Sequence, residues 1–434
     1  ERRGKMGTER TRVRLIFISQ PKGAPKWPSI HFDPHRRAEQ LREILRRRLP
    51  EIEFIGGDVV TSSDKMSEIA GRISLGEDGI AVFNLGSSWG LNPILKADLP
   101  TLIINDPLLF GGAGMIAHSQ RIRREGARAV IISTTDWDEI DRKFRLLHVI
   151  SSLRRAKFLS IGGGPGADRE IMGAAVERVP VDELNRSYEK ADEEEARGIA
   201  RRWMEGADAV VEPSEEEILK SAKLYLAMKE LMEERGAVGI AVDCLGLFYA
   251  GKLPAYPCLG FAQIDDEPGL ISACENDIAS LLTKFVVKLI TGKPSFLSEP
   301  DMDSSRDLAI YAHCVSATRM AGLDEEPEPY IIRSHAEDDK GAALQVRFRP
   351  GIPVTVVKLI PDERRILLLR GESLGAFVSD RGCRSKMAVR VPDAQRLLEN
   401  WQHSWHRVVV YGDYARDFEH LARLIGFDVC YEGV

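Results

Sequence analysis

The sequence has few cysteines, no long apolar run and no excess of positive charge, and each absence excludes a class of protein. Six cysteines are spread over 434 residues without a CxxC pair, which argues against a zinc ribbon and for reduced thiols in a cytoplasmic protein. No run approaches the roughly 18 apolar residues that a membrane span needs. The net charge of −6 gives no reason to expect nucleic acid. We therefore expect neither a membrane nor a nucleic-acid partner.

Alternating apolar and amphipathic segments predict the fold. Residues 12–155 alternate in this way, which indicates a parallel sheet flanked by helices. A second such unit begins at "KFLSIGGGPGADR", and from about residue 326 short strands follow one another with turn residues between them. We predict an α/β protein with two Rossmann-like parallel-sheet domains, followed by a mostly antiparallel, barrel-like β domain. The predicted domains are residues 10–156, 157–325 and 326–434.

The segment "SIGGGPGADR", residues 160–169, is a predicted strand followed by a glycine turn, as in nucleotide-binding proteins. However, Gly162, Gly164 and Gly166 do not give the spacing G-x-G-x-x-G, and Pro165 lacks a donor N–H. No Walker lysine follows. The pattern favours a tight structural turn, although its free amides could still bind a phosphorylated or sulfonated sugar.

Two glutamates follow apolar runs in "GLISACENDIASLLTKFVVKLITGKPSFLSEPD". "GLISAC" is a predicted strand, and the apolar residues after it recur at helical spacing until Thr291-Gly292 ends the helix. Glu275 thus comes at the carboxyl end of one strand, and Glu299 at the corresponding position of a second strand predicted over "KPSFLS". Ligands of open α/β sheets bind at this edge.

Two further segments each place a histidine beside an apolar run. "DLAIYAHC" contains His313, and "WQHSWHRVVVYGD" places His406 directly before a predicted strand, with His403 three residues earlier. Two carboxylates with one or two imidazoles suit Mn²⁺, Mg²⁺, Co²⁺ or Fe²⁺. Structural alternatives stay open, because a Glu at a helix start can cap the helix and a single His can be a hydrogen-bonded core residue. Spacing alone does not join these residues.

The same segments resemble the metal-site region of the L-fucose isomerase and L-arabinose isomerase superfamily, in particular its shorter members. The resemblance covers about residues 240–430. It implies that Glu275, in a Cys-Glu-x-Asp context, and Glu299, in "FLSEP", are metal ligands. It also implies that His313, in "AHC", and His406, in "HRVVVYGD", complete the shell. The family's two N-terminal α/β domains agree with the predicted domain order.

The resemblance implies a metal-dependent aldose–ketose isomerase, with Mn²⁺ as the first choice of ion. The reaction would pass through an enediolate, and Glu275 and Glu299 would act as base and acid while also binding the metal. Open alternatives are a hydride shift, a non-catalytic sugar-binding or regulatory homologue, and a metal-dependent sugar epimerase or aldolase. A Glu as second acid matches the arabinose branch, whereas fucose isomerases carry Asp. The identity of the sugar and of the base stays open.

Three further residues lie in segments that resemble sugar-contacting parts of the family. "FISQPKG" points to Gln20, "NLGSSWG" offers Trp89 as a stacking face, and "RSHAEDDKGA" points to His335. Each could instead be a packing or turn residue. Because one subunit of such enzymes closes the site of another, the resemblance implies a homo-oligomer with its sites near subunit interfaces.

Overall fold

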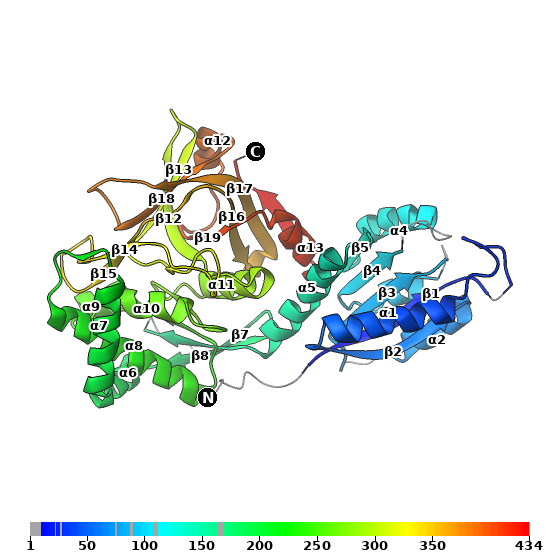
Figure 1. Ribbon diagram of the computed structural model, residues 1–434, viewed down its shortest axis with the longest axis horizontal. Helices are drawn as coiled ribbons and strands as arrows, with labels where there is room; N and C mark the ends of the chain where they lie inside the picture. Colours follow the sequence, from blue (N-terminus) through cyan, green and yellow to red (C-terminus); the bar gives the residue numbers. More distant parts are fainter. Residues whose placement is uncertain are drawn as a thin grey trace. The chain divides into compact units, whose positions relative to one another are not determined.

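The chain forms two compact units in the computed structural model (Figure 1). The structure describes residues 10–21, 23–26, 28–73, 76–86, 90–106, 112–162 and 168–433. The first unit comprises the described residues of Glu1–Ser152 and Arg416–Asp428, and the second those of Leu153–Ala415 and Val429–Val434. No helix in these described ranges is both long and apolar enough to cross a membrane. The division into three domains at residues 156 and 325 stays a prediction.

The first unit is built on a five-stranded parallel sheet in the order β2-β1-β3-β4-β5. Its strands are nearly continuous apolar runs, because helices cover both faces of such a sheet. The elements are β1 (Thr11–Ile18), α1 (Pro34–Arg48), β2 (Ile52–Val60), α2 (Ser63–Gly71), β3 (Gly79–Asn84), α3 (Asn92–Leu95), β4 (Thr101–Asn105), α4 (Gly112–Glu125), β5 (Ala129–Ser133), α5 (Trp137–Arg155) and α13 (Ala415–Ile425).

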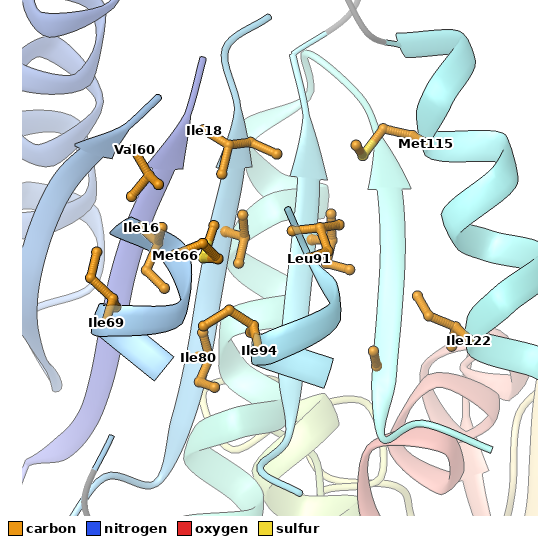
Figure 2. Packing of buried hydrophobic residues seen from close by; sticks show 13 residues of the cluster. Ile16, Ile18, Val60, Met66, Ile69, Ile80, Leu91, Ile94, Met115 and Ile122 are labelled. Atoms are coloured by element: carbon orange, nitrogen blue, oxygen red, sulfur yellow. The ribbon is translucent and has the colours of Figure 1, made fainter. Parts of the chain in front are cut away.

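One face of this sheet packs against α2, α3 and α4. Figure 2 shows Met66, Ile94 and Met115 reaching from these helices to strand residues such as Ile18 and Ile80. All five side chains are nearly inaccessible to solvent. This apolar cluster stabilises the sheet through burial of hydrocarbon surface.

A buried ion pair attaches the late helix α13 to the first unit. Lys143 Nζ of α5 donates to Asp417 Oδ1 of α13 at 2.6 Å, and the two side chains are only 4% and 11% exposed. The guanidinium of Arg128 donates to the Leu424 carbonyl at 2.8 Å. The first unit thus combines residues from the beginning of the chain with the late segment Arg416–Asp428.

The second unit contains a second sheet in the order β11-β10-β6-β8-β7, in which only β7 runs antiparallel to its neighbour. Its elements are β6 (Lys157–Ile161), β7 (Arg169–Ile171), β8 (Ala174–Val179), α6 (Val181–Lys190), α7 (Glu193–Gly206), β9 (Ala209–Val210), α8 (Glu215–Arg235), β10 (Gly239–Val242), α9 (Cys244–Tyr249), α10 (Cys258–Asp265), β11 (Ile271–Ala273) and α11 (Ile278–Thr291).

The second unit also contains a closed antiparallel barrel in the order β16-β19-β12-β13-β18-β17, closed by pairing of β17 with β16 (yellow to red in Figure 1). β20 extends it beside β17, and β14 and β15 form a separate small sheet with β9. The remaining elements are β12 (Phe296–Asp303), β13 (Leu308–His313), β14 (Tyr330–Arg333), β15 (Ala343–Val346), β16 (Pro350–Ile360), η1 (Pro361–Glu363), β17 (Arg365–Ala376), β18 (Ser385–Arg390), α12 (Ala394–Glu399), β19 (Arg407–Tyr411) and β20 (Asp428–Tyr431).

The predicted fold class is therefore confirmed: the chain is α/β, with a parallel sheet in its first part and an antiparallel barrel near its end. The barrel begins earlier than the change of sequence pattern at residue 326, because β12 and β13 already belong to it. These two strands lead directly to the candidate site.

Candidate metal centre

Glu275 lies in a left-handed turn that follows β11. Glu275 and Asn276 both have positive φ, 55° and 52°, a conformation that costs a residue with a side chain about 1 to 2 kcal/mol. The Asn276 N–H donates to the Val242 carbonyl at 3.0 Å, and its side chain accepts from Ser160 Oγ at 2.9 Å. The ends of β10 and β6 thus hold the backbone that carries Glu275.

Asp277 ends this turn and caps α11. Its Oδ1 accepts the Ser280 N–H at 2.9 Å. Its Oδ2 accepts from Lys358 Nζ of β16 at 2.7 Å and from His406 Nδ1–H at 3.0 Å. Burial favours the neutral acid, but the His406 hydrogen bond and the Lys358 charge outweigh it and hold the pKa of Asp277 well below its usual value. Asp277 is therefore ionised and links helix, barrel and histidine.

His313 and His406 lie beside each other, at the end of β13 and just before β19. Their rings are stacked with centroids 5.7 Å apart, and both side chains are buried. His406 donates from Nδ1, so in the neutral ring its Nε2 carries a lone pair. His313 instead accepts the Cys314 N–H at Nδ1 (2.9 Å), which leaves the hydrogen of its neutral ring on Nε2.

The Nε2 atoms of both histidines lie close to the Glu275 carboxylate. Nε2 of His313 is 3.9 Å from Glu275 Oε1, and Nε2 of His406 is 3.8 Å from Glu275 Oε2. These distances exceed the hydrogen-bond range, and neither Nε2 has a hydrogen-bond partner among the described residues. The ligand atoms of Glu275, His313 and His406 all lie within 4.8 Å of one another. The chain therefore has a candidate three-residue metal site.

Glu299 lies at the border of this group. Its Oε1 is 3.6 Å from Nε2 of His406, and its side chain is 38% exposed. Burial first, and then repulsion from Glu275, raise the pKa of Glu299. It therefore takes up a proton more readily than an ordinary glutamate, while remaining accessible to a ligand.

The position of Glu299 in the fold corrects the sequence-based expectation. It does not lie at the carboxyl end of a parallel strand but within β12, opposite Ala312 of the antiparallel β13. The apolar run ends at Ser298, yet the strand continues, because backbone pairing with β13 rather than side-chain polarity sustains it. Barrel strands thus supply Glu299 and His313, the residue directly before the barrel strand β19 is His406, and the turn after β11 of the second sheet supplies Glu275.

The donor set fits a divalent cation. Carboxylate oxygens and imidazole nitrogens bind such ions at about 2.0 to 2.2 Å, so separations of 3.6 to 3.9 Å suit ligands that share one ion. A buried polar atom without a partner costs about 1 to 3 kcal/mol, which ligation removes. His406 needs no change to bind through Nε2, whereas His313 must move its hydrogen to Nδ1 and give up the Cys314 contact.

The other three predicted residues have different positions. His335 is buried, not in an exposed turn, and its ring stacks on Tyr256 with centroids 4.2 Å apart. It also contacts Cys314, the neighbour of His313. Gln20 follows β1 in the first unit and is half-buried, and Trp89 lies outside the described residues. Sugar contacts by these residues stay predictions.

Sequence reasoning missed Asp277 and Lys358. The signal for Asp277 was its position directly before a predicted helix. An aspartate there typically caps the helix by accepting a backbone N–H of the first turn, here that of Ser280. The signal for Lys358 was a charge inside the apolar strand "VTVVKL", since a buried lysine requires a partner.

A cavity of about 370 Å³ lies at the carboxyl edge of the second sheet. Gly162, Arg178, Asp243 and Lys252 are among the residues that line it. Oδ1 of Asp243 is used within α9, where it accepts the Gly246 N–H at 3.3 Å. The cavity thus combines two cationic side chains with a carboxylate that already has a backbone partner.

Fold and donor set together define an α/β protein with a candidate site for a divalent metal ion. No family model matches the chain. It is similar to a sulfoquinovose isomerase of Clostridium sp. (strain MSTE9), with 23% identity over 75% of this chain and 79% of that protein. A sulfoquinovose isomerase of Alkalicoccus urumqiensis is 22% identical over 67% of this chain and 68% of its own length. The likeness supports the predicted enzyme class, an isomerase.

Metal-free protein should show the burial of His313 in the pH dependence of its stability. Burial first, and then the neighbouring His406, lower the pKa of His313 to about 3 from the ordinary 6.5. As the pH falls from 6.5 toward 3, the unfolded chain takes up a proton here and the folded protein does not. The His313 contribution therefore lowers the free energy of unfolding by up to about 1.4 kcal/mol per pH unit.

Denaturant unfolding with chelator present, at several pH values between 6.5 and 4.5, measures this slope. His313→Gln should lose stability less steeply than the wild type as the pH falls. Parallel curves for the two proteins would contradict the assignment of a neutral, buried imidazole.

Proposed function

We propose that the chain is a metal-dependent aldose–ketose isomerase of the fucose and arabinose isomerase type. The observation that carries the proposal is the pair of buried Nε2 atoms, of His313 and His406, beside the Glu275 carboxylate. Neither atom has a hydrogen-bond partner among the residues that the structure describes. Similarity to two sulfoquinovose isomerases over most of the chain supports the reaction class.

Glu275, Glu299, His313 and His406 would hold the ion. Mn²⁺ is the proposed ion, because a mixed shell of carboxylates and imidazoles without thiolates suits it. When bound, it supplies Lewis-acid stabilisation of negative charge on the sugar oxygens. Since His406 already presents a lone pair and His313 does not, we propose that His406 is the stronger ligand.

The two glutamates would transfer the proton between adjacent carbons of the sugar. Glu275, held by a rigid turn, takes the proton as base. Glu299 has a raised pKa and a partly exposed carboxyl group, so it is the better candidate to carry and return a proton as acid. Such transfers contribute about 10²- to 10⁴-fold each.

We propose a sugar with an anionic substituent as substrate. Both named relatives act on sulfoquinovose, and the 370 Å³ cavity brings Arg178 and Lys252 to the sheet edge that also carries Glu275. Asn276, next to Glu275, donates from its side chain to the Gly162 carbonyl at the cavity wall (3.4 Å). The sulfonate would lie in this cavity, against the guanidinium of Arg178.

Replacing Glu299 by Gln should abolish most turnover. The expected fall in kcat is about 10²- to 10⁴-fold, because the amide cannot carry the proton. Ketose formation from a panel of aldoses, including a sulfonated hexose, measures it, with circular dichroism to verify the fold. His403→Gln is the matched control, because His403 Nδ1 is paired with Glu363 at 2.8 Å and His403 does not belong to the group of Glu275, His313 and His406.

Wild-type turnover in Glu299→Gln would remove this residue from the mechanism. Tight Mn²⁺ binding by the wild type without ketose from any aldose would instead favour the sugar-binding or epimerase alternatives.

Arg178→Met should raise KM for a sulfonated sugar about tenfold, since loss of a charged hydrogen bond costs about 1.5 to 3 kcal/mol and Arg178 is partly solvated. The KM for the same sugar with a hydroxyl in place of the sulfonate should be unchanged. Steady-state kinetics on this matched pair of substrates, repeated with Lys252→Met, gives the answer. Equal effects on both sugars would contradict an anion subsite in this cavity.

A further inference from the structure

Lys358 is a buried cation inside an apolar barrel strand. Its side chain is 1% exposed, and the neighbouring residues of β16 are buried as well. Its Nζ donates to Asp277 Oδ2 at 2.7 Å and to Ser280 Oγ at 2.6 Å. An apolar side chain would be the simpler choice for packing at this position, because burying an ammonium group costs several kcal/mol before pairing is counted.

The same carboxylate oxygen serves the histidine of the candidate site. Oδ2 of Asp277 accepts from Lys358 Nζ and also from His406 Nδ1–H, at 3.0 Å. A continuous series of contacts therefore runs from β16 through the first turn of α11 to the imidazole. The series ends at Nε2 of His406. This atom lies 3.8 Å from Oε2 of Glu275 and 3.6 Å from Oε1 of Glu299.

A neutral imidazole has two tautomers, and only one of them leaves Nε2 free to bind a cation. An acceptor at Nδ1 selects that tautomer and also fixes the plane of the ring. Helix capping by itself does not need Lys358, because the Ser280 N–H already binds the other oxygen, Oδ1 of Asp277. Lys358 Nζ and the Ser280 hydroxyl, which donates at 2.8 Å, together hold Oδ2, the oxygen that faces His406. Lys358 also donates to that hydroxyl, so it fixes Oδ2 directly and through Ser280.

We propose that Lys358 and Asp277 are positioning residues that keep His406 in its Nδ1–H tautomer, with the Nε2 lone pair directed at Glu275 and Glu299. The inference rests on the proposed function for its purpose, since the ring is positioned for a cation. The arrangement itself is a property of the protein without metal and is measurable there.

The variants Lys358→Met and Asp277→Asn test the proposal. Lys358→Met keeps the length of the side chain and removes its charge, and Asp277→Asn keeps the shape of the acceptor and removes its charge. Lys143→Met is the matched control, because Lys143 is also a buried lysine paired with an aspartate, Asp417, and both belong to the first unit, whereas His406 belongs to the second.

The first readout is the tautomer of His406 in metal-free protein. Nitrogen-15 NMR of histidine-labelled protein distinguishes the two tautomers, and the signal of His406 is assigned by its absence in His406→Gln. We expect the Nδ1–H form in the wild type and in Lys143→Met. In Lys358→Met and Asp277→Asn, the Nε2–H form should become populated.

The second readout is the affinity for Mn²⁺ alone, measured by calorimetry on samples whose fold circular dichroism has verified. Loss of such an outer partner typically costs 10- to 100-fold in metal affinity, so we expect this loss in both variants and none in Lys143→Met. If Asp277→Asn does not fold, because Asp277 also caps α11, Lys358→Met decides the question alone.

An unchanged His406 tautomer together with Mn²⁺ affinity within twofold of the wild type in Lys358→Met would overturn the positioning role. In that case the proposed function stands if the wild type binds Mn²⁺ and His406→Gln does not. A wild type with the Nδ1–H tautomer but no affinity for any divalent ion would instead overturn the proposed function, and with it the purpose of this positioning.

Discussion

The candidate site depends on two buried imidazole rings, each with one nitrogen that has no hydrogen-bond partner in the part of the chain that the structure describes. Protein interiors rarely leave such atoms unpaired, because each costs about 1 to 3 kcal/mol. Here the unpaired atoms are Nε2 of His313 and of His406, and both lie within 4 Å of the Glu275 carboxylate. A shared cation is the simplest chemical partner for all three groups. The other features of the site follow from the need to hold them in place.

The architecture meets this need by joining two kinds of sheet. The second sheet, which is mostly parallel, carries Glu275 in a strained turn after β11. The antiparallel barrel carries Glu299, His313 and His406 in or directly beside its strands. The helix α11 connects the two, since it begins at Ile278, directly after its cap Asp277, and ends at Thr291, shortly before β12. Side chains on strands are positioned more accurately than side chains on loops. Glu299 and His313 lie within strands, and Glu275 and His406 lie within two residues of a strand end. The site therefore lies where the two sheets meet rather than at the edge of either one.

Much of the fold was predictable from periodicity, and the site less so. Alternating apolar and amphipathic segments give the parallel sheet of the first unit, and short strands separated by turns give most of the barrel. Periodicity did not reveal that β12 belongs to the barrel rather than to the parallel sheet, because an apolar strand has the same pattern in both. Glu299 was therefore placed at the wrong kind of strand position.

Only family resemblance suggested that four residues meet in one site: Glu275, Glu299, His313 and His406. No local pattern encodes contacts between residues so far apart in the sequence. Asp277 and Lys358 carried local signals, a helix cap and a charge in an apolar strand. Each signal indicates that the residue needs a contact but does not identify the partner. The partner is seen only in the folded chain.

Pulsed electron paramagnetic resonance on Mn²⁺ bound to the wild-type protein tests most directly whether His406 binds the ion. Coordination by a histidine couples the electron spin of the ion to a nitrogen nucleus and modulates the spin echo. We expect modulation from imidazole nitrogen, and we expect it to weaken when His406 is replaced by Gln. A Mn²⁺ spectrum with no nitrogen modulation, or one that His406→Gln leaves unchanged, would contradict it.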